Sequence, residues 1–383
     1  MTALRPAERL LLLLLALCIA LAGVANYQRW SVLPRFVLAT LALAGIAWAV
    51  SFATEQLGER FGTAVTGLLQ ATLANLPELF VVIFALQKGQ LVVARTAIVG
   101  SILANALLVL GLVIVVGARR APDGVMRFSR RLPRDTATLL QVTVFIIVLL
   151  GLSLGAHDPA SHHVKAISVV GAVCLLVVYL TWVIPYLRAD SAAARARRGA
   201  DAEAHGGGPE RSDTARALPE RSAVSLPGEG PRLALEHALA LLLAAGAAAA
   251  FVSDWFVAAL APAIHQLEIP PAFAGLVIVA IAGNAVENAV GVVLAWKGRS
   301  ELAIAVVKNS VAQIAAFLFP LLVLISLLLA HALTFALSPV YVGALALTAL
   351  AVWQVTGDGE AVAFEGWALI ALYAILATLT LYE

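Results

Sequence analysis

Eleven stretches of about twenty mostly apolar residues follow one another along this chain, and they constrain its fold more than any other feature. A helix needs about twenty such residues to cross the hydrocarbon core of a bilayer. With 62% hydrophobic and 13% charged residues, the chain is far more apolar than soluble proteins are. We therefore predict an all-α polytopic membrane protein with about 11 transmembrane helices. The runs lie near 8–25, 33–52, 62–86, 91–117, 136–155, 165–187, 233–252, 272–296, 302–329, 332–354 and 361–382.

Positive charge is concentrated in alternate loops, which predicts how the helices are oriented. Arginines follow the fourth run, residues 188–232 carry further arginines after the sixth, and Lys297 and Arg299 follow the eighth. Cytoplasmic loops are enriched in Lys and Arg. We therefore expect the N-terminus in the cytoplasm and the C-terminus outside. The expected setting is the lipid bilayer of a bacterial inner (plasma) membrane.

Residues 1–30 begin with arginines that precede an apolar run. A charged start followed by an apolar run fits a cleavable signal peptide as well as a retained helix. We expect a retained, extra N-terminal transmembrane helix, because it completes the alternation of the loops. Residues 253–271 hold several prolines and polar side chains, which predicts an outer loop with an interfacial helix.

Residues 189–231 differ in composition from the rest of the chain. They are rich in Ala, Gly, Pro and Ser and carry charges of both signs, a composition that is typical of disordered segments. We therefore predict a disordered cytoplasmic linker here. It separates a first membrane repeat, residues 31–188, from a second, residues 232–383.

Each half carries an asparagine three residues before a glutamate, in the middle of an apolar run. A carboxylate at the centre of a membrane helix costs roughly 2.5–3.5 kcal/mol on insertion scales, so it normally has a function. In both halves a Lys-Gly pair follows the glutamate by ten residues and a serine follows it by twenty-three. Matching motifs on helices of opposite direction predict inverted repeats, the common plan of secondary transporters. The matched residues are Asn75, Glu78, Lys88, Gly89 and Ser101, and Asn284, Glu287, Lys297, Gly298 and Ser310.

The motif residues are those that a hard cation requires. Asparagine and glutamate three residues apart lie on one helix face, and Pro77 and Gly283 weaken the helix beside them. Carboxylate, amide and carbonyl oxygens are the ligands of calcium, whereas no imidazole or thiol stands nearby to favour zinc or copper. We therefore predict a cation site formed by Glu78, Glu287, Asn75 and Asn284.

Polar residues on the helices that follow each motif are candidates for lining a cation pathway. They are Ser101, Asn105, Ser310 and Gln313. Such residues also mediate close helix packing and interhelical hydrogen bonds. The sequence leaves the two roles open, and one residue can serve both.

A pair of buried carboxylates can hold either protons or a cation, which favours an antiporter. The leading hypothesis is exchange of Ca²⁺ (or Na⁺) for H⁺, with no cofactor. Alternatives are a Na⁺/H⁺ or Na⁺-coupled Ca²⁺ exchanger, an intramembrane enzyme that uses two acids, and a passive channel, which tight binding disfavours. Nothing indicates nucleic-acid binding, and the oligomeric state is left open.

These motifs resemble those of the calcium/proton exchanger branch of the calcium/cation antiporter superfamily. The resemblance covers roughly residues 50–120 and 270–325. It implies ten core helices in two inverted five-helix repeats, preceded by the extra N-terminal helix. It also implies that Glu78 and Glu287 bind the cation and exchange it for protons, with the motif asparagines as co-ligands. The resembling stretches are Gly67 to Glu78, Gly100 to Gly111, Gly275 to Glu287 and Ser310 to Gln313.

The chain departs from the family pattern at four positions. Gln70 stands where asparagine is usual, and Ala74 and Asn309 stand where glycine is usual. Asn288 replaces the histidine that normally follows the second glutamate. Because histidine titrates near neutral pH and asparagine does not, this last departure bears on proton coupling and on selectivity for calcium.

Overall fold

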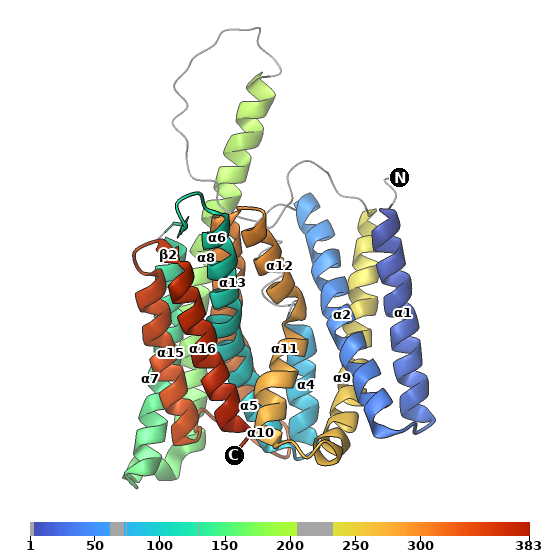
Figure 1. The fold of residues 1–383 in the computed structure, drawn as a ribbon, viewed down its shortest axis with the longest axis vertical. Helices are drawn as coiled ribbons and strands as arrows, with labels where there is room; N and C mark the ends of the chain where they lie inside the picture. The colour runs from blue at the N-terminus through green and yellow to red at the C-terminus, as the bar shows by residue number, and fades with distance from the viewer. Residues whose placement is uncertain (1–3, 62–72, 74, 130, 205–232) are drawn as a thin grey trace.

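The computed structural model describes residues 4–61, 73, 75–129, 131–204 and 233–383. In this part of the chain, nine helices are long and apolar enough to cross a membrane, and a further pair of helices, bent by 61° at the break between them, makes ten if the pair is one span. The helices stand side by side in one bundle, and the described N-terminal end lies at the opposite end of the bundle from the C-terminus (Figure 1). The predicted all-α membrane fold is confirmed.

The first half runs from α1 to α8. Its predicted span at 62–86 lies partly outside the described residues and is seen from α4 onward. α8 continues through residues 189–204, so the start of the expected linker is helical and that part of the prediction is wrong. The reason is that its alanines and arginines are strong helix formers; residues 205–232 lie outside the described part. The elements are α1 (Pro6–Tyr27), α2 (Val32–Phe61), α4 (Leu76–Gln87), α5 (Leu91–Leu103), the π-helix η1 (Ala104–Val109), α6 (Leu110–Arg120), β1 (Val125–Arg127), α7 (Arg131–Gly155), the 3₁₀-helix η2 (Pro159–His163) and α8 (Val164–Ala204).

The second half runs from α9 to α16. The outer loop predicted at 253–271 is wrong for most of its length, because α9 continues to Gln266. Phe256 and Leu260 are fully buried on its packed face, and this burial outweighs the helix-weakening Pro262. The elements are α9 (Leu235–Gln266), α10 (Pro271–Phe273), the π-helix η3 (Ala274–Val279), α11 (Ala280–Gly283), α12 (Ala285–Trp296), α13 (Ser300–Gln313), the π-helix η4 (Ile314–Leu318), α14 (Phe319–Ser326), α15 (Pro339–Thr356), β2 (Glu360–Val362) and α16 (Ala363–Thr380).

The two halves repeat the same backbone geometry in opposite directions. α4 and α12 each end in a three-residue turn whose glycine has a left-handed φ, 71° at Gly89 and 72° at Gly298. The helix after each turn passes into a π-helix, η1 in the first half and η4 in the second. The end of α4 lies at the lower end of the bundle in Figure 1 and the end of α12 at the upper end. The backbone therefore has the inverted repeat that the motifs predicted.

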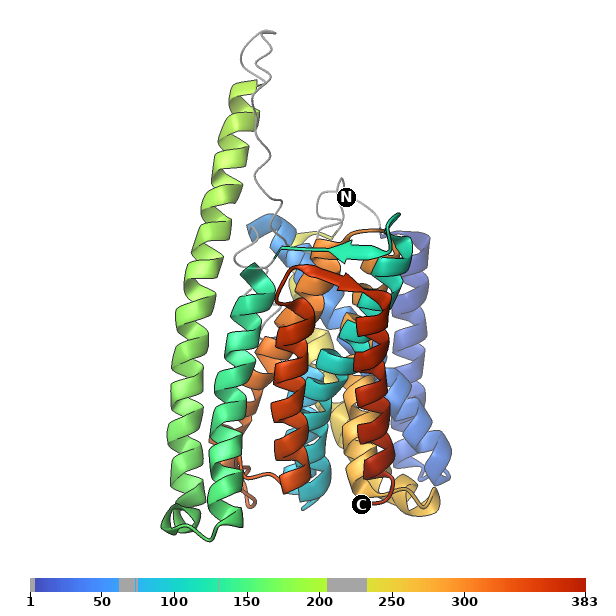
Figure 2. The ribbon, with the colours of Figure 1, turned by 60° about the vertical axis from the view of Figure 1, so that its left-hand side comes forward.

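A two-stranded antiparallel ribbon closes the upper end of the bundle (Figure 2). It pairs Val125 in β1 with Val362 in β2 and so joins the loop after α6 to the loop after α15. Arg127 in β1 forms ion pairs with Asp123 at 2.6 Å and with Glu360 at 3.4 Å. The ribbon links the two halves at this end.

Two glycines allow the helices that carry the motifs to cross closely. A Cβ atom on Gly100 of α5 would collide with the backbone of Leu276 in η3, and one on Gly275 would collide with Thr96 of α5. The contact brings α5 of the first repeat against η3 in the broken helix of the second repeat. Ser101 and Asn105 are thereby held beside Asn284.

Candidate functional site

The motif asparagines stand directly before α4 and α12. Asn75 precedes α4 with φ −89° and ψ 10°, and Asn284 precedes α12 with φ −99° and ψ 15°. At Asn284 the span bends by 61°. Each glutamate is the third residue of the helix that follows, so Glu78 and Glu287 lie in the first turns of two half-helices. The break predicted from Gly283 is confirmed. The break predicted from Pro77 stays a prediction, because most of residues 62–74 lie outside the described part of the chain.

Glu78 is packed tightly inside the protein. Its side chain is 6% exposed, and its Oε1 accepts a hydrogen bond from Ser101 Oγ at 3.3 Å. A Cβ atom at Gly283 would lie only 2.8 Å from Glu78 Cγ. Gly283 therefore provides the space that the Glu78 side chain occupies.

A chain of hydrogen bonds crosses from Glu78 to the second repeat. Asn284 Nδ2 donates to Ser101 Oγ at 3.0 Å and to Ala280 O at 2.9 Å. Asn284 Oδ1 accepts from Asn105 Nδ2 at 2.8 Å. The hydrogen bond from Asn105 thus determines which way the Asn284 amide faces. The Asn284 nitrogen lies on the side of Ser101 and Glu78.

The half of the site around Glu287 has fewer hydrogen bonds. Among the described residues, Glu287 Oε2 and Ser310 Oγ are buried without a hydrogen-bond partner, although they correspond in sequence to Glu78 and Ser101. Asn75 Nδ2 donates instead to Gln313 Oε1, at a long 3.5 Å. The motif asparagine of each repeat therefore contacts an amide side chain of the other repeat, but the bond is shorter for Asn284.

The two carboxylates are close enough for their charges to interact. Two like charges in a low-dielectric interior resist being ionised together, unless protons or a cation compensate them. A small cavity of about 10 Å³ adjoins Glu78 and Ser101, which is roughly the space for one water-sized sphere. Among the described residues, this arrangement leaves space for a small ion or protons at Glu78.

Two contributors to the site escaped the sequence analysis. Ser253 of α9 donates to the carbonyl oxygen of Pro77 at 3.4 Å, but its segment had been predicted as a loop. Gly283 had been read only as a weak point in its helix. Its role in making room for Glu78 depends on the approach of two distant helices, which the local sequence does not encode.

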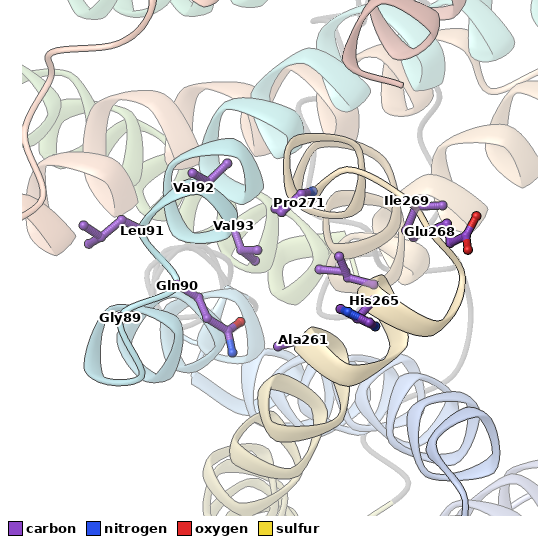
Figure 3. A pocket seen from close by; sticks show the side chains of 11 residues that line it. Gly89, Gln90, Leu91, Val92, Val93, Ala261, His265, Glu268, Ile269 and Pro271 are labelled. Atoms are coloured by element: carbon purple, nitrogen blue, oxygen red, sulfur yellow. The ribbon is translucent and has the colours of Figure 1, made fainter. Parts of the chain in front are cut away.

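A larger cavity, of about 670 Å³, opens at the lower end of the bundle between the start of α5 and the end of α9. Figure 3 shows its lining, in which Gln90 and His265 extend from the two sides and the remaining surface is mostly apolar. None of the predicted site residues lines it. It is therefore separate from the carboxylate site.

Comparison with known proteins identifies the class to which this fold and site belong. The family model described as "Sodium/calcium exchanger protein" matches residues 31–185 and 237–382. The chain belongs to this family, whose fold is that of a membrane-embedded secondary transporter. Both matched segments contain one Asn-x-x-Glu motif.

The chain is similar to named exchangers over most of its length. It is 29% identical to a Ca(2+)/H(+) antiporter of Synechocystis sp., over 97% of this chain and 96% of the relative. It is 28% identical to a vacuolar calcium ion transporter of Schizosaccharomyces pombe, over 94% and 82%. The solved structure of native YfkE superposes with a TM-score of 0.75 at 23% identity, covering 97% of this chain and 100% of that one. The resemblance to the calcium/proton exchanger branch is confirmed.

Proposed function

We propose that this protein exchanges Ca²⁺ for H⁺ across its membrane, through a site at Glu78 and Glu287 near the middle of the bundle. The observation that carries the proposal is the approach of α4 to the broken helix of the second repeat, where Glu78 packs against Gly283 and so brings carboxylates from opposite repeats within electrostatic reach. The names of the similar exchangers support calcium and protons as the substrates.

The oxygen set suits a hard divalent cation. Two carboxylates, the amides of Asn75 and Asn284 and the hydroxyls of Ser101 and Ser310 together supply enough oxygens for the six to eight that calcium takes. Asn284 presents its nitrogen toward Glu78, so we infer that its amide turns over to ligate a cation. Asn105 donates to Asn284 through Nδ2, so its amide must turn as well; its Oδ1, unpartnered among the described residues, would then accept from the Asn284 N–H group.

The exchange follows from shared occupancy of the carboxylates. When the cation leaves, two adjacent negative charges remain in a low-dielectric site, and binding protons relieves their repulsion. A ligand that changes the relative stability of two conformations shifts the equilibrium between them. We infer that the cation-loaded and proton-loaded forms rearrange and that the empty, doubly charged form does not.

We further propose that the upper end of the bundle in Figure 1 faces the cytoplasm of a bacterial plasma membrane. Arg119, Arg120, Lys297 and Arg299 lie at the helix ends or turns on that side, as the positive-inside rule requires. Ser101, Asn105, Ser310 and Gln313 would line the pathway.

A sodium-dependent mode is a second candidate, favoured by Asn288. Its Oδ1 is buried without a hydrogen-bond partner in the described part of the chain, and it adds a neutral oxygen beside Glu287 where the family has histidine. A site with more neutral oxygens and one titrating group fewer is better suited to a monovalent ion.

Cation-dependent proton flux in proteoliposomes tests both candidates. The purified chain is reconstituted, and internal pH is followed after external addition of calcium, sodium, potassium or manganese. We expect calcium to release protons without any need for sodium. Calcium uptake that requires a sodium gradient and moves no protons would reject proton exchange in favour of the sodium-coupled candidate.

A further inference from the structure

Lys88 joins the two repeats at the lower end of the bundle by an ion pair. Its Nζ lies 2.7 Å from Asp254 Oδ1 in α9 and donates to the carbonyl oxygen of the same residue at 3.0 Å. Two residues further on, Gln90 Nε2 donates to Val257 O at 3.4 Å. The turn between α4, which carries Glu78, and α5 is therefore attached to α9 of the second repeat.

The matching turn at the upper end is held differently. Lys297 occupies the position of Lys88 in the second repeat, but in the described part of the chain neither Lys297 nor Arg299 forms an ion pair. The end of α12 is held instead by Arg120, whose Nε donates to Trp296 O at 2.9 Å and whose guanidinium carbon lies 4.6 Å from the centre of the Trp296 ring. Of the two matching turns, the lower one is therefore the one that an ion pair ties to the opposite repeat.

The ion pair can open without unfolding the bundle. The side chains of Lys88 and Asp254 are 32% and 44% exposed, so water and salt reach both. Ion pairs of this kind contribute little to the stability of a folded protein and are weakened by salt. In transporters built from inverted repeats, one part of the bundle rocks against the other around a fixed site. An exposed ion pair suits such a movement, because it favours one conformation without preventing the other.

The ion pair stands beside the larger cavity, the one between the start of α5 and the end of α9. Gln90 belongs to the lining of this cavity (Figure 3), and so does Val93 of α5. Ala97, one turn further along α5, lines instead the small cavity beside Glu78. The Cα atoms of Val93 and Ala97 are separated by ~6 Å along the helix. Movement of α9 away from the turn would therefore extend the larger cavity toward Glu78.

We propose that Lys88 and Asp254 form a latch that keeps the lower end of the bundle closed, and that the larger cavity becomes the entrance to Glu78 from that end when the latch opens. The inference rests on the proposed function, since an exchanger must expose Glu78 to each end in turn. The entrance admits a hydrated cation or a proton. The latch determines how often the site is open to the lower end.

A cysteine beside Glu78 reports whether the lower end is open. Ala97→Cys is introduced into the full-length protein after Cys18→Ala and Cys174→Ala have removed the native thiols, and it is labelled with a charged, membrane-impermeant methanethiosulfonate. Ala261→Cys, in the wall of the larger cavity, is the control reporter. The reagent is added to intact cells or to inverted membrane vesicles, whichever preparation labels Ala261→Cys, so that it acts from the lower end.

Three changes break or restore the latch, and one matched variant leaves it intact. Lys88→Met and Asp254→Asn each remove one charge of the ion pair. Lys88→Glu combined with Asp254→Lys restores the pair with its charges exchanged. Lys297→Met removes the corresponding lysine at the upper end and serves as the control variant.

We expect Lys88→Met and Asp254→Asn each to raise the labelling rate at position 97 by about twofold to fivefold, the range that an exposed ion pair supports. The charge-exchanged protein should return toward the rate of the intact latch, and Lys297→Met should not raise it. Added salt should speed the labelling when the latch is intact but not in Asp254→Asn, because no ion pair is then left to screen.

The latch is rejected if Lys88→Met and Asp254→Asn label like Lys297→Met. It is also rejected if labelling rises equally at positions 97 and 261, which a general loosening of the fold would produce. The salt dependence tests the latch in protein that keeps Lys88 and Asp254, so a labelling rate at position 97 that does not respond to salt overturns the inference even if the other variants fail to fold.

The labelling needs no transport, so the latch and the proposed function are judged separately. If Glu78→Gln and Glu287→Gln abolish exchange while the Lys88 and Asp254 variants label like the protein with the intact latch, the carboxylate site stands and only the latch is rejected. If the two glutamine variants still exchange calcium for protons, the proposed function fails first.

Discussion

The halves of the candidate site around Glu78 and around Glu287 share a motif and a backbone but differ in their hydrogen bonds. Glu78 accepts from Ser101 and belongs to a network that continues through Asn284 to Asn105. Around Glu287, oxygens of the carboxylate and of the matching serine have no partner in the described part of the chain. The difference shows that equal motifs in an inverted repeat do not give equal environments. One half is held in place, and the other has free ligand atoms.

The strongest test of this comparison is to remove each carboxylate charge in turn. Glu78→Gln and Glu287→Gln should each abolish exchange, by a hundredfold or more, because each removes a ligand charge and a proton carrier while preserving shape. Transport and the amount of folded protein are measured together. If only one variant is inactive, the two halves are functionally as well as structurally unequal.

The dependence of cation affinity on pH shows whether protons compete at the site. Protons and the cation bind the same carboxylates, so raising the pH removes the competitor. Apparent affinity should therefore strengthen with rising pH, by up to about tenfold per unit for each proton displaced. The measurement is calcium affinity in wild type and Glu287→Gln between about pH 5.5 and 8.5. A flat wild-type profile would exclude proton competition.

Asn288→His extends the same experiment to the half around Glu287. It restores a group that titrates near neutral pH beside the carboxylate. We expect it to change the shape of the pH profile more than the maximal rate. An unchanged pH profile would mean that the side chain at position 288 does not influence cation or proton binding at Glu287.

Gly283→Ala tests how tightly the Glu78 half is packed. Helix propensity alone predicts a gain of about 1 kcal/mol in stability from this change. Because the new Cβ would lie 2.8 Å from Glu78 Cγ, we expect instead a loss of transport of about tenfold. Gly246→Ala is the matched control, since its Cβ would meet only Leu76, at 3.8 Å. Equal transport in Gly283→Ala and Gly246→Ala would contradict the inference that a side chain at position 283 displaces Glu78.

Two alanine variants compare the hydrogen bonds that the motif asparagines form with amide side chains of the other repeat, and the smallest effect is expected at Gln313. Asn105→Ala removes the 2.8 Å bond to Asn284, and Gln313→Ala removes the 3.5 Å contact with Asn75. Loss of a partner of a buried polar group costs roughly 1–3 kcal/mol. We expect about tenfold weaker calcium affinity for Asn105→Ala and a twofold to threefold change for Gln313→Ala. A larger loss of affinity in Gln313→Ala than in Asn105→Ala would contradict the conclusion that the half of the site around Glu78 is the more firmly hydrogen-bonded one.

The membrane-spanning helices and the repeated architecture of this protein could be predicted from its sequence alone. Apolar runs long enough to span a bilayer must form helices there, because unpaired backbone groups are too costly in lipid. The repeated Asn-x-x-Glu motif, with Gly283 beside its second copy, was sufficient to predict the broken helix of the second half and the inverted repeat. These features depend on residues that are close in the chain, so they can be read locally.

Only the tertiary structure decided the features that depend on neighbours distant in the chain. The packing of α9 makes residues 253–266 helical despite Pro262 and several polar side chains. The crossing at Gly100 and Gly275 determines that Asn105 reaches Asn284. The two Asn-x-x-Glu motifs then acquire different hydrogen-bond partners among the described residues. The contacts between distant segments therefore decide that the half of the site around Glu78 is hydrogen-bonded, whereas the half around Glu287 keeps unpartnered oxygens among the described residues.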